Sequence, residues 1–529
     1  MKKFSIITLA LATLALVGCD KYLDTKPTSS TADATIFEST ENAALAVNGL
    51  NRLMYCQYNY WGQGFNGEGT VRLYMGEYPG DKLMSCTQTG WKLEASGDAW
   101  VNNQDDINEY AWYYYYMVIS NANSIIAQID GAEGPEADRK FIKAQALCYR
   151  AYCYSNLVQL FGRRWSDNNG DTPSCVLRVI AGGEDNLDRA KTKDVYAQIY
   201  QDLDDAIQLF TESGKANQRG ADVHWMDLDV AYAIYARVAL TREDWQKALD
   251  MAKLARKNYP LMSVADYNKG FCNPTSESIW SLYNVDDETI YYYSFFAYIG
   301  YNSNAGNVRS RPKLISKHLF DQINAADIRR GLFLDPAGMG TDVWDPATNL
   351  ALAQGTSNAL SAAGRAQASA NGRKGIASNA SVAAYMQFKF ACNTAPGVGH
   401  LTLFRSSEML LIEAEANYRL NKPADAQAAL VELNATSGRY PGYTCTLTGD
   451  ALMNEIKLYR GIELWGEGFT WFDLKRWSDG MSRKDYTGGG NWLTDFAVDV
   501  PPTKHNWTWI IPKQETDTNK GILSTSNED

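Results

Sequence analysis

Hydrophobic residues recur at helical spacing in several parts of the chain. Between residues 245 and 259, four of them stand three or four positions apart and line one face of a helix: Trp245, Ala248, Ala252 and Ala255. Residues 229–239 predict a preceding helix, and Pro260 follows the pair. A helix pair of about 34 residues that ends at a proline is typical of a tetratricopeptide repeat, whose units stack because none buries its apolar face alone.

The same periodicity predicts further helices at residues 112–129, 140–161, 194–210, 406–420 and 424–434. We therefore expect a mostly α fold, a tetratricopeptide-like helical repeat solenoid. Two stretches break the pattern. Residues 262–312 mix aromatic clusters with Gly, Asn and Ser, which indicates short strands or an irregular region, and residues 345–382 have so few large apolar side chains that they predict a long loop.

The first residues carry a targeting pattern. Lys2 and Lys3 precede an apolar run at 4–17 that is too short to span a bilayer, and residues 16–19, Leu-Val-Gly-Cys, are typical of a bacterial lipoprotein processing site. We expect residues 1–18 to be a cleaved signal peptide and Cys19 to carry more than one acyl chain, which anchors a protein stably. An ordinary secretory signal that leaves Cys19 unmodified is the alternative.

Composition excludes several functions. A net charge of -11 argues against nucleic-acid binding, which requires clustered Lys and Arg. Apart from Cys19 there are eight cysteines without a C-x-x-C pair, and the four histidines form no H-E-x-x-H, so no metal site or cofactor is predicted. No G-x-S-x-G or P-loop occurs either. We expect no enzymatic activity, although a surface glycan hydrolase stays an alternative because the spacing of two carboxylates cannot be read from a sequence.

The most specific motif is found at residues 458–477, LYRGIELWGEGFTWFDLKRW. It resembles the signature of the SusD/RagB family, the surface lipoproteins with which Bacteroidetes capture nutrients. Other stretches agree with that family in the same order, namely 19–24, 149–162, 408–418 and 511–515. Tyr459 and Thr470 depart from it, since the family usually has an acidic and a basic residue there. Within the motif we expect a scaffold of ion pairs between the acids Glu463, Glu467 and Asp473 and the bases Arg460, Lys475 and Arg476.

The resemblance implies a tetratricopeptide-like fold with a loop-rich ligand-binding region. It also implies a partner, a SusC-type TonB-dependent outer-membrane transporter to which the protein delivers oligosaccharides. We therefore expect a non-catalytic glycan-binding lipoprotein on the cell surface, with a tether at 19–35, an N-terminal helical part at 36–260 and a C-terminal part at 261–529. A binder of peptides or glycoproteins and a protein-interaction scaffold are the alternatives.

Sugar binding requires aromatic faces and a few polar groups, and aromatic residues make up 12% of this chain. Candidates are the residues of this kind in loop-like sequence context: Trp100, Asn103, Tyr292, Trp91, Tyr74, Phe295 and Trp344. The family resemblance favours Trp100, Asn103 and Tyr292. For each aromatic residue, packing in the core is the alternative, because Trp and Tyr are often largely buried.

Overall fold

The computed structural model describes residues 35–55, 65–85, 99–183, 186–215, 222–284, 294–337, 344–345, 350–351 and 358–522. The predicted signal peptide, Cys19 and almost all of the predicted tether lie outside these ranges. Within them, no helix is both long and apolar enough to cross a membrane.

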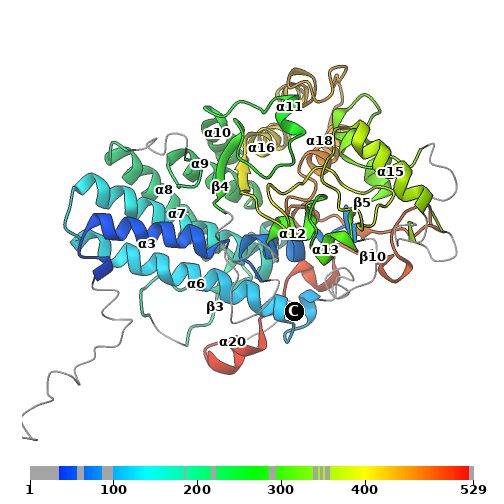
Figure 1. Ribbon diagram of the computed structural model, residues 1–529. Coiled ribbons are helices and arrows are strands. Elements are labelled where there is room, and N and C mark those ends of the chain that lie inside the picture. The colour runs from blue at the N-terminus through cyan, green and yellow to red at the C-terminus, as the bar shows by residue number, and fades with distance from the viewer. Residues whose placement is uncertain are drawn as a thin grey trace, which may run out of the picture.

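The N-terminal half is a stack of helices, most of them antiparallel pairs (Figure 1). It contains α3 (Thr40–Leu53), α6 (Asp106–Gln128), α7 (Glu136–Phe161), α8 (Thr192–Glu212), α9 (Leu228–Thr241) and α10 (Trp245–Arg256). Each of α6, α8 and α3 packs against α7, and α9 packs against α10. Aspartates begin several of these helices; Asp227, for example, accepts a hydrogen bond from the N–H of Val230.

The C-terminal half continues the stack. It contains α16 (Ser406–Arg419), α17 (Pro423–Val431), the π-helix η7 (Glu432–Thr436), α18 (Gly449–Glu463), α19 (Thr470–Trp477) and α20 (Lys513–Thr518), and α16 packs against α10. The predicted mostly helical, tetratricopeptide-like fold is confirmed, with helix ends that differ by a few residues from the periodicity.

Short antiparallel strand pairs connect neighbouring segments and, in two cases, distant parts of the chain. The distant pairs are β1 (Leu83–Ser85) with β5 (Lys313–Ile315) and β4 (Ser278–Leu282) with β8 (Leu401–Arg405). The others are β2 (Pro173–Val176) with β3 (Arg189–Lys191), β6 (Trp344–Asp345) with β7 (Leu350–Ala351), and β9 (Met481–Ser482) with β10 (Asp499–Val500). Around β4 and β5 lie the short helices α11 (Val264–Tyr267), α12 (Phe295–Ile299), α13 (Gly306–Arg309) and α14 (Lys317–Gln322). The irregular region predicted at 262–312 thus contains short helices as well as strands.

The prediction of a loop throughout residues 345–382 is wrong, because residues 358–370 form helix α15 (Asn358–Ala370). Alanine is the best helix former, and this segment is rich in it. Side chains of α15 also bind the chain around it: Arg365 donates to the carbonyl of Ala380 at 2.7 Å, and Gln367 donates to the carbonyl of Asp335 at 3.0 Å. The helix lies at the opposite end of the molecule from α3 and α8 (Figure 1).

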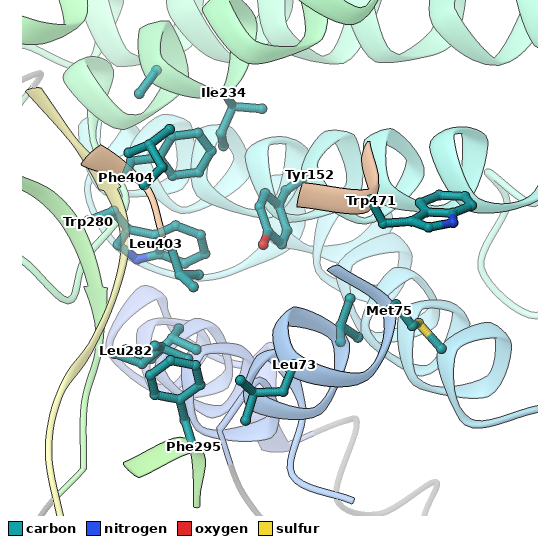
Figure 2. Close-up of a cluster of buried hydrophobic side chains, with 14 of the residues drawn as sticks. Leu73, Met75, Tyr152, Ile234, Trp280, Leu282, Phe295, Leu403, Phe404 and Trp471 are labelled. Carbon is teal, nitrogen blue, oxygen red and sulfur yellow. The ribbon is translucent and has the colours of Figure 1, made fainter. Parts of the chain in front are cut away.

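The core gathers side chains from both halves around the β4–β8 pair (Figure 2). Trp280 of β4 and Phe404 of β8 stack with ring centroids 6.2 Å apart, and Tyr152 of α7 meets both rings edge-on. Below them runs a fully buried π-helix, η1 (Val71–Glu77). It approaches the chain before α19 so closely that a Cβ on Gly76 would lie 2.3 Å from the carbonyl oxygen of Gly468.

The family-like motif at 458–477 forms two helices and a sharp turn between them. Helix α18 ends at Glu463, and Gly466 and Gly468 adopt φ values of +77° and +92° before α19 begins. Only glycine adopts such angles without strain.

The predicted ion-pair scaffold exists, but three of its six members, Glu463, Glu467 and Lys475, have other partners. Asp473 binds Arg460 at 2.7 Å and Arg476 at 2.8 Å, as expected. Glu463 instead binds Arg329, Arg405 and Arg439, and Glu467 binds Lys389 and Arg405. The predicted acidic partner of Lys475 is wrong, because its ammonium group donates to backbone carbonyls of α7 and the residue after it, Gln159 and Gly162.

Candidate functional site

Three of the aromatic residues proposed from the sequence lie in the core. Trp100 is 1% exposed, and its ring packs against Trp471 and Trp507 with centroid distances of 5.6 and 5.3 Å. Tyr74 and Phe295 are buried as well. The expectation that these rings are open to a ligand is therefore wrong, since no face of them reaches the surface.

The other proposed residues have different positions. Asn103 is half-buried, and its carbonyl accepts a hydrogen bond from the N–H of Lys513 at 2.8 Å. Trp344 pairs with Ala351 in the β6–β7 pair. Tyr292 and Trp91 lie outside the described residues. A role in ligand binding stays a prediction for these four.

A different set of rings meets at the end of the β4–β8 pair. Tyr283 directly follows β4, His400 directly precedes β8, and His224 lies beside both. The centroid of the His224 ring is 5.0 Å from that of Tyr283 and 5.0 Å from that of His400, and the Tyr283 and His400 rings are 5.3 Å apart. Tyr283 is 49% exposed and Trp225, next to His224 in the chain, is 41% exposed. We call these four residues the Tyr283 platform.

Backbone contacts hold the platform rigidly. The N–H of Ser281 donates to the carbonyl of Val223 at 2.9 Å, so residues 223–224 lie along the free edge of β4. The imidazole Nδ1 of His224 is 2.9 Å from the carbonyl oxygen of Ser281. The buried Asn51 side chain connects both parts, because it donates to the carbonyl of His224 at 2.9 Å and accepts from the N–H of Tyr283 at 3.4 Å. The His224 ring and the backbone of Tyr283 are therefore held in place before any ligand arrives.

His400 contributes a neutral ring. Burial, with a smaller effect from the neighbouring His224, lowers the pKa of His400 to about 4. The backbone N–H of His400 donates to the carbonyl of Cys272 at 2.9 Å. The backbone N–H of Asn284 approaches the ring Nδ1 of His400 at 3.4 Å. At neutral pH this imidazole is therefore uncharged and packs as an aromatic ring.

Polar groups stand next to the platform. The exposed amides of Asn273 and Asn393 bond to each other through both groups, at 2.7 and 2.8 Å. Asn273 directly follows Cys272, whose carbonyl holds His400. Asn393 also donates to the carbonyl of Cys272 at 3.4 Å and accepts from the thiol of Cys272 at 3.3 Å, so the Asn273 amide oxygen, with its second lone pair, is the group of this pair best placed to accept from a sugar hydroxyl.

Two segments outside the described residues begin or end at this site. Residues 56–64 follow Tyr55, whose hydroxyl donates to the carbonyl of Gly399 at 3.0 Å. Residues 285–293 run from Asn284, beside His400, to Ser294, whose hydroxyl donates to the carbonyl of Gly397 at 2.5 Å. The predicted ligand residue Tyr292 belongs to this second segment.

The sequence contained a signal for this site that the periodicity did not reveal. An aromatic residue and an amide, Tyr283 and Asn284, directly follow the run Ser278–Leu282, which reads as a buried strand. The adjacent aromatic residues His224 and Trp225 were a second such signal in the sequence. Chemistry that depends on metal has no support in the described part of the chain, where no three His, Cys, Asp or Glu side chains gather in a suitable group.

Comparison with known proteins matches both halves of the chain to one family. Residues 21–240 match a SusD-like family described as "Starch-binding associating with outer membrane", and residues 354–527 match the SusD family. SusD-like protein P2 of Formosa agariphila is 26% identical over 291 residues, which are 54% of this chain and 53% of that protein. The chain thus matches about half the length of this relative. SusD-like protein P38 of the same organism is 21% identical over 519 residues, which are 90% of this chain and 92% of that protein.

Solved structures agree with the fold. A SusD-like carbohydrate binding protein from Bacteroides vulgatus superposes with a TM-score of 0.73 at 24% identity, covering 92% of this chain and 98% of its own. Since the family matches span both the N-terminal helical stack and the motif-bearing C-terminal part, the chain belongs to the SusD/RagB family.

Proposed function

We propose that this protein captures oligosaccharides at the Tyr283 platform, on the outer face of the outer membrane, and delivers them to a SusC-type TonB-dependent transporter. The observation that carries the proposal is the exposed Tyr283 ring, held edge-on against the His224 ring at the end of a buried strand pair. The family membership and the carbohydrate-binding relative support it.

The platform suits sugar chemically. A pyranose presents a face of C–H groups, which packs on an aromatic ring, and hydroxyls around its rim, which need donors and acceptors. Tyr283 and Trp225 supply exposed ring surface, and Asn273 and Asn393 supply amides. Because the Tyr283 ring already packs against the rings of His224 and His400, little side-chain entropy is lost on binding.

Binding to a glycan array tests the site. We expect wild-type protein to bind a subset of neutral glycans and Tyr283→Ala to lose at least about fivefold in affinity, since stacking and burial of one ring contribute on the order of 1–3 kcal/mol. Tyr486→Ala is the matched control, because that tyrosine has a similar exposure of 44%. Equal binding by wild type and Tyr283→Ala would remove the platform from the site.

The same samples separate the alternatives. Peptides and glycoproteins spotted beside the glycans would identify a binder of that class. Sustained release of new reducing ends from a bound glycan would show a hydrolase and contradict the family expectation of a non-catalytic protein.

Anchoring and delivery have their own tests. Cys19→Ser should lose lipid labelling and leave the membrane fraction, whereas an unchanged membrane fraction would disprove the anchor. Protease added to intact cells should degrade the protein if it faces the medium. An outer-membrane barrel should co-purify in detergent, and its repeated absence would contradict the transporter role.

A further inference from the structure

A second concave surface lies away from the Tyr283 platform, at the end of α10. It is a groove of about 640 Å³ between the last turn of α10, the segment after it and the π-helix η7. This volume is within the range of small-ligand sites. The groove shares no residue with the platform. Its polar lining includes Lys253, Lys257, Asn258, Ser263 and Thr436.

Two exposed lysines line the groove. Lys253 and Lys257 are both exposed, and neither forms an ion pair with any residue that the structure describes. The charge of Lys253 acts only at longer range on the carboxyl group of Glu413. In a chain of net charge -11, two such lysines on one concave surface are distinctive.

The acids around the groove are already engaged. Arg256 lies between Glu413 and Glu432, with its Nη1 2.7 Å from Oε1 of Glu432. Asp229 accepts hydrogen bonds from Asn258 and from the hydroxyl of Tyr259, both at 3.2 Å. These carboxylates offset the formal charge of the surroundings, but none of them lies in ion-pair contact with the ammonium groups of Lys253 and Lys257, which leaves both groups open to an anion among the residues that the structure describes.

The π-helix shapes the other wall. Its wider turn lets Glu432 reach Arg256 while Asn434, two residues later, points inward and accepts from Nη2 of Arg329 at 2.5 Å. Thr436, at its end, is exposed on the groove. Turns of this kind are frequent at functional sites.

Compensation of the helix dipole is the simplest alternative role for the lysines. Cations near a helix C-terminus are stabilising, and Lys253 lies in the last turn of α10. This effect explains the charge of one helix end, but it requires neither a groove nor the hydroxyls that face it.

We propose that this groove binds a carboxylate-bearing oligosaccharide, with its carboxylates at Lys253 and Lys257 and its hydroxyls at the amide oxygen of Asn258 and the hydroxyl of Thr436. The inference extends the proposed function from neutral sugars to uronic-acid sugars, and it rests on that function for the choice of a sugar over a peptide. An exposed lysine pairs weakly with one carboxylate, so a ligand with a carboxylate on each successive unit fits two lysines best.

Titration calorimetry with a tetramer of galacturonic acid tests the groove, with maltotetraose as the uncharged probe. We expect the double variant Lys253→Gln/Lys257→Gln to bind the acidic tetramer about tenfold more weakly at low salt, and to lose most of the salt dependence of binding. Lys247→Gln is the matched control, because this lysine is on the same helix and packs over the Tyr235 ring.

Three results would overturn the proposal. The first two are unchanged binding of the acidic tetramer by the double variant and an equal loss of binding in Lys247→Gln. The third is binding of tetraglutamate as tight as that of the sugar, which would assign the groove to acidic peptides. Tyr283→Ala separates the two sites. If the groove is correct, this variant keeps its affinity for the acidic tetramer, whatever happens to neutral glycans. If only the platform is correct, the double lysine variant keeps its binding to neutral glycans and Tyr283→Ala loses it.

Discussion

The hydroxyl of Thr470 donates a hydrogen bond to Oε2 of Glu77 at 2.8 Å, across 393 positions of sequence. The other oxygen of Glu77 accepts from the N–H groups of Gly468 at 2.7 Å and Phe469 at 3.1 Å. A carboxyl group of the buried π-helix η1 thus satisfies donors at the start of α19. Thr470 departs from the family pattern, and this contact gives it a structural role.

Stability should depend on pH through Glu77. Burial raises the pKa of Glu77 to about 7, although the bonds from Thr470 and Gly468 act against it. As the pH rises above about 4.5, the unfolded chain releases this proton first, so the free energy of unfolding should fall between pH 4.5 and 7, by about 3 kcal/mol. Urea unfolding of wild type and Glu77→Gln at pH 5 and pH 8 measures it. The glutamine variant should lack this part of the decrease. An equal change in the free energy of unfolding between pH 5 and pH 8 in both proteins would contradict the raised pKa of Glu77.

Helices α7 and α8 are joined by a buried ion pair. Nη2 of Arg150 lies 2.6 Å from Oδ1 of Asp202, and Nε lies 2.9 Å from Oδ2. Asp202→Ala should lower the free energy of unfolding by about 3–5 kcal/mol, because it leaves a buried guanidinium without its partner. Asp205→Ala, on the same helix with an exposed bond to Gln201, should change it by less than about 0.5 kcal/mol. Similar values for both variants would show that the pair contributes little.

Lys475 closes the C-terminal end of α7. Its buried ammonium group donates to the carbonyls of Gln159 and Gly162, the second at 2.7 Å. Lys475→Met should cost about 1–3 kcal/mol or more, since both carbonyls lose this donor in the core. The half-exposed Lys513, replaced by Met, provides the comparison by thermal unfolding. A Lys475→Met protein as stable as wild type would mean that water replaces the amine.

The imidazole of His400 should titrate with a pKa of about 4 in the folded protein. The unfolded chain takes up this proton near pH 6.5, so the contribution of His400 to stability should be lost as the pH falls from 6.5 toward 4. NMR titration of the ring C–H signals measures the pKa, and His400→Gln should lose less stability over that range. Titration near pH 6.5 in the native protein would contradict the buried, neutral ring.

The helices were predictable because each buries a periodic face whose residues are near one another in sequence. Trp245 and the alanines after it, for example, specify α10 without reference to the rest of the chain. Trp100 was not predictable in this way. Its burial depends on Trp471 and Trp507, residues hundreds of positions away, and its local sequence reads as a loop.

The same limit applies to the candidate site. Tyr283 is exposed beside two histidines only because β4 pairs with β8, whose residues lie about 120 positions later. Helix α15 was missed for a different reason. The absence of large apolar residues in 345–382 outweighed the helix propensity of its alanines, whereas contacts from Arg365 and Gln367 support the helix.

The fixed ends of residues 56–64 and 285–293 have an evolutionary consequence. Tyr55, Asn284 and Ser294 are each bound to the chain next to His400 or just before it, so these described residues beside the two segments are held by the scaffold. Doubling the length of such a segment costs only about 0.6 kcal/mol in loop entropy. If the proposed function holds, we expect insertions and deletions there to alter sugar recognition while the described helical stack folds unchanged, so that members of one family could acquire different ligands through two short stretches of chain.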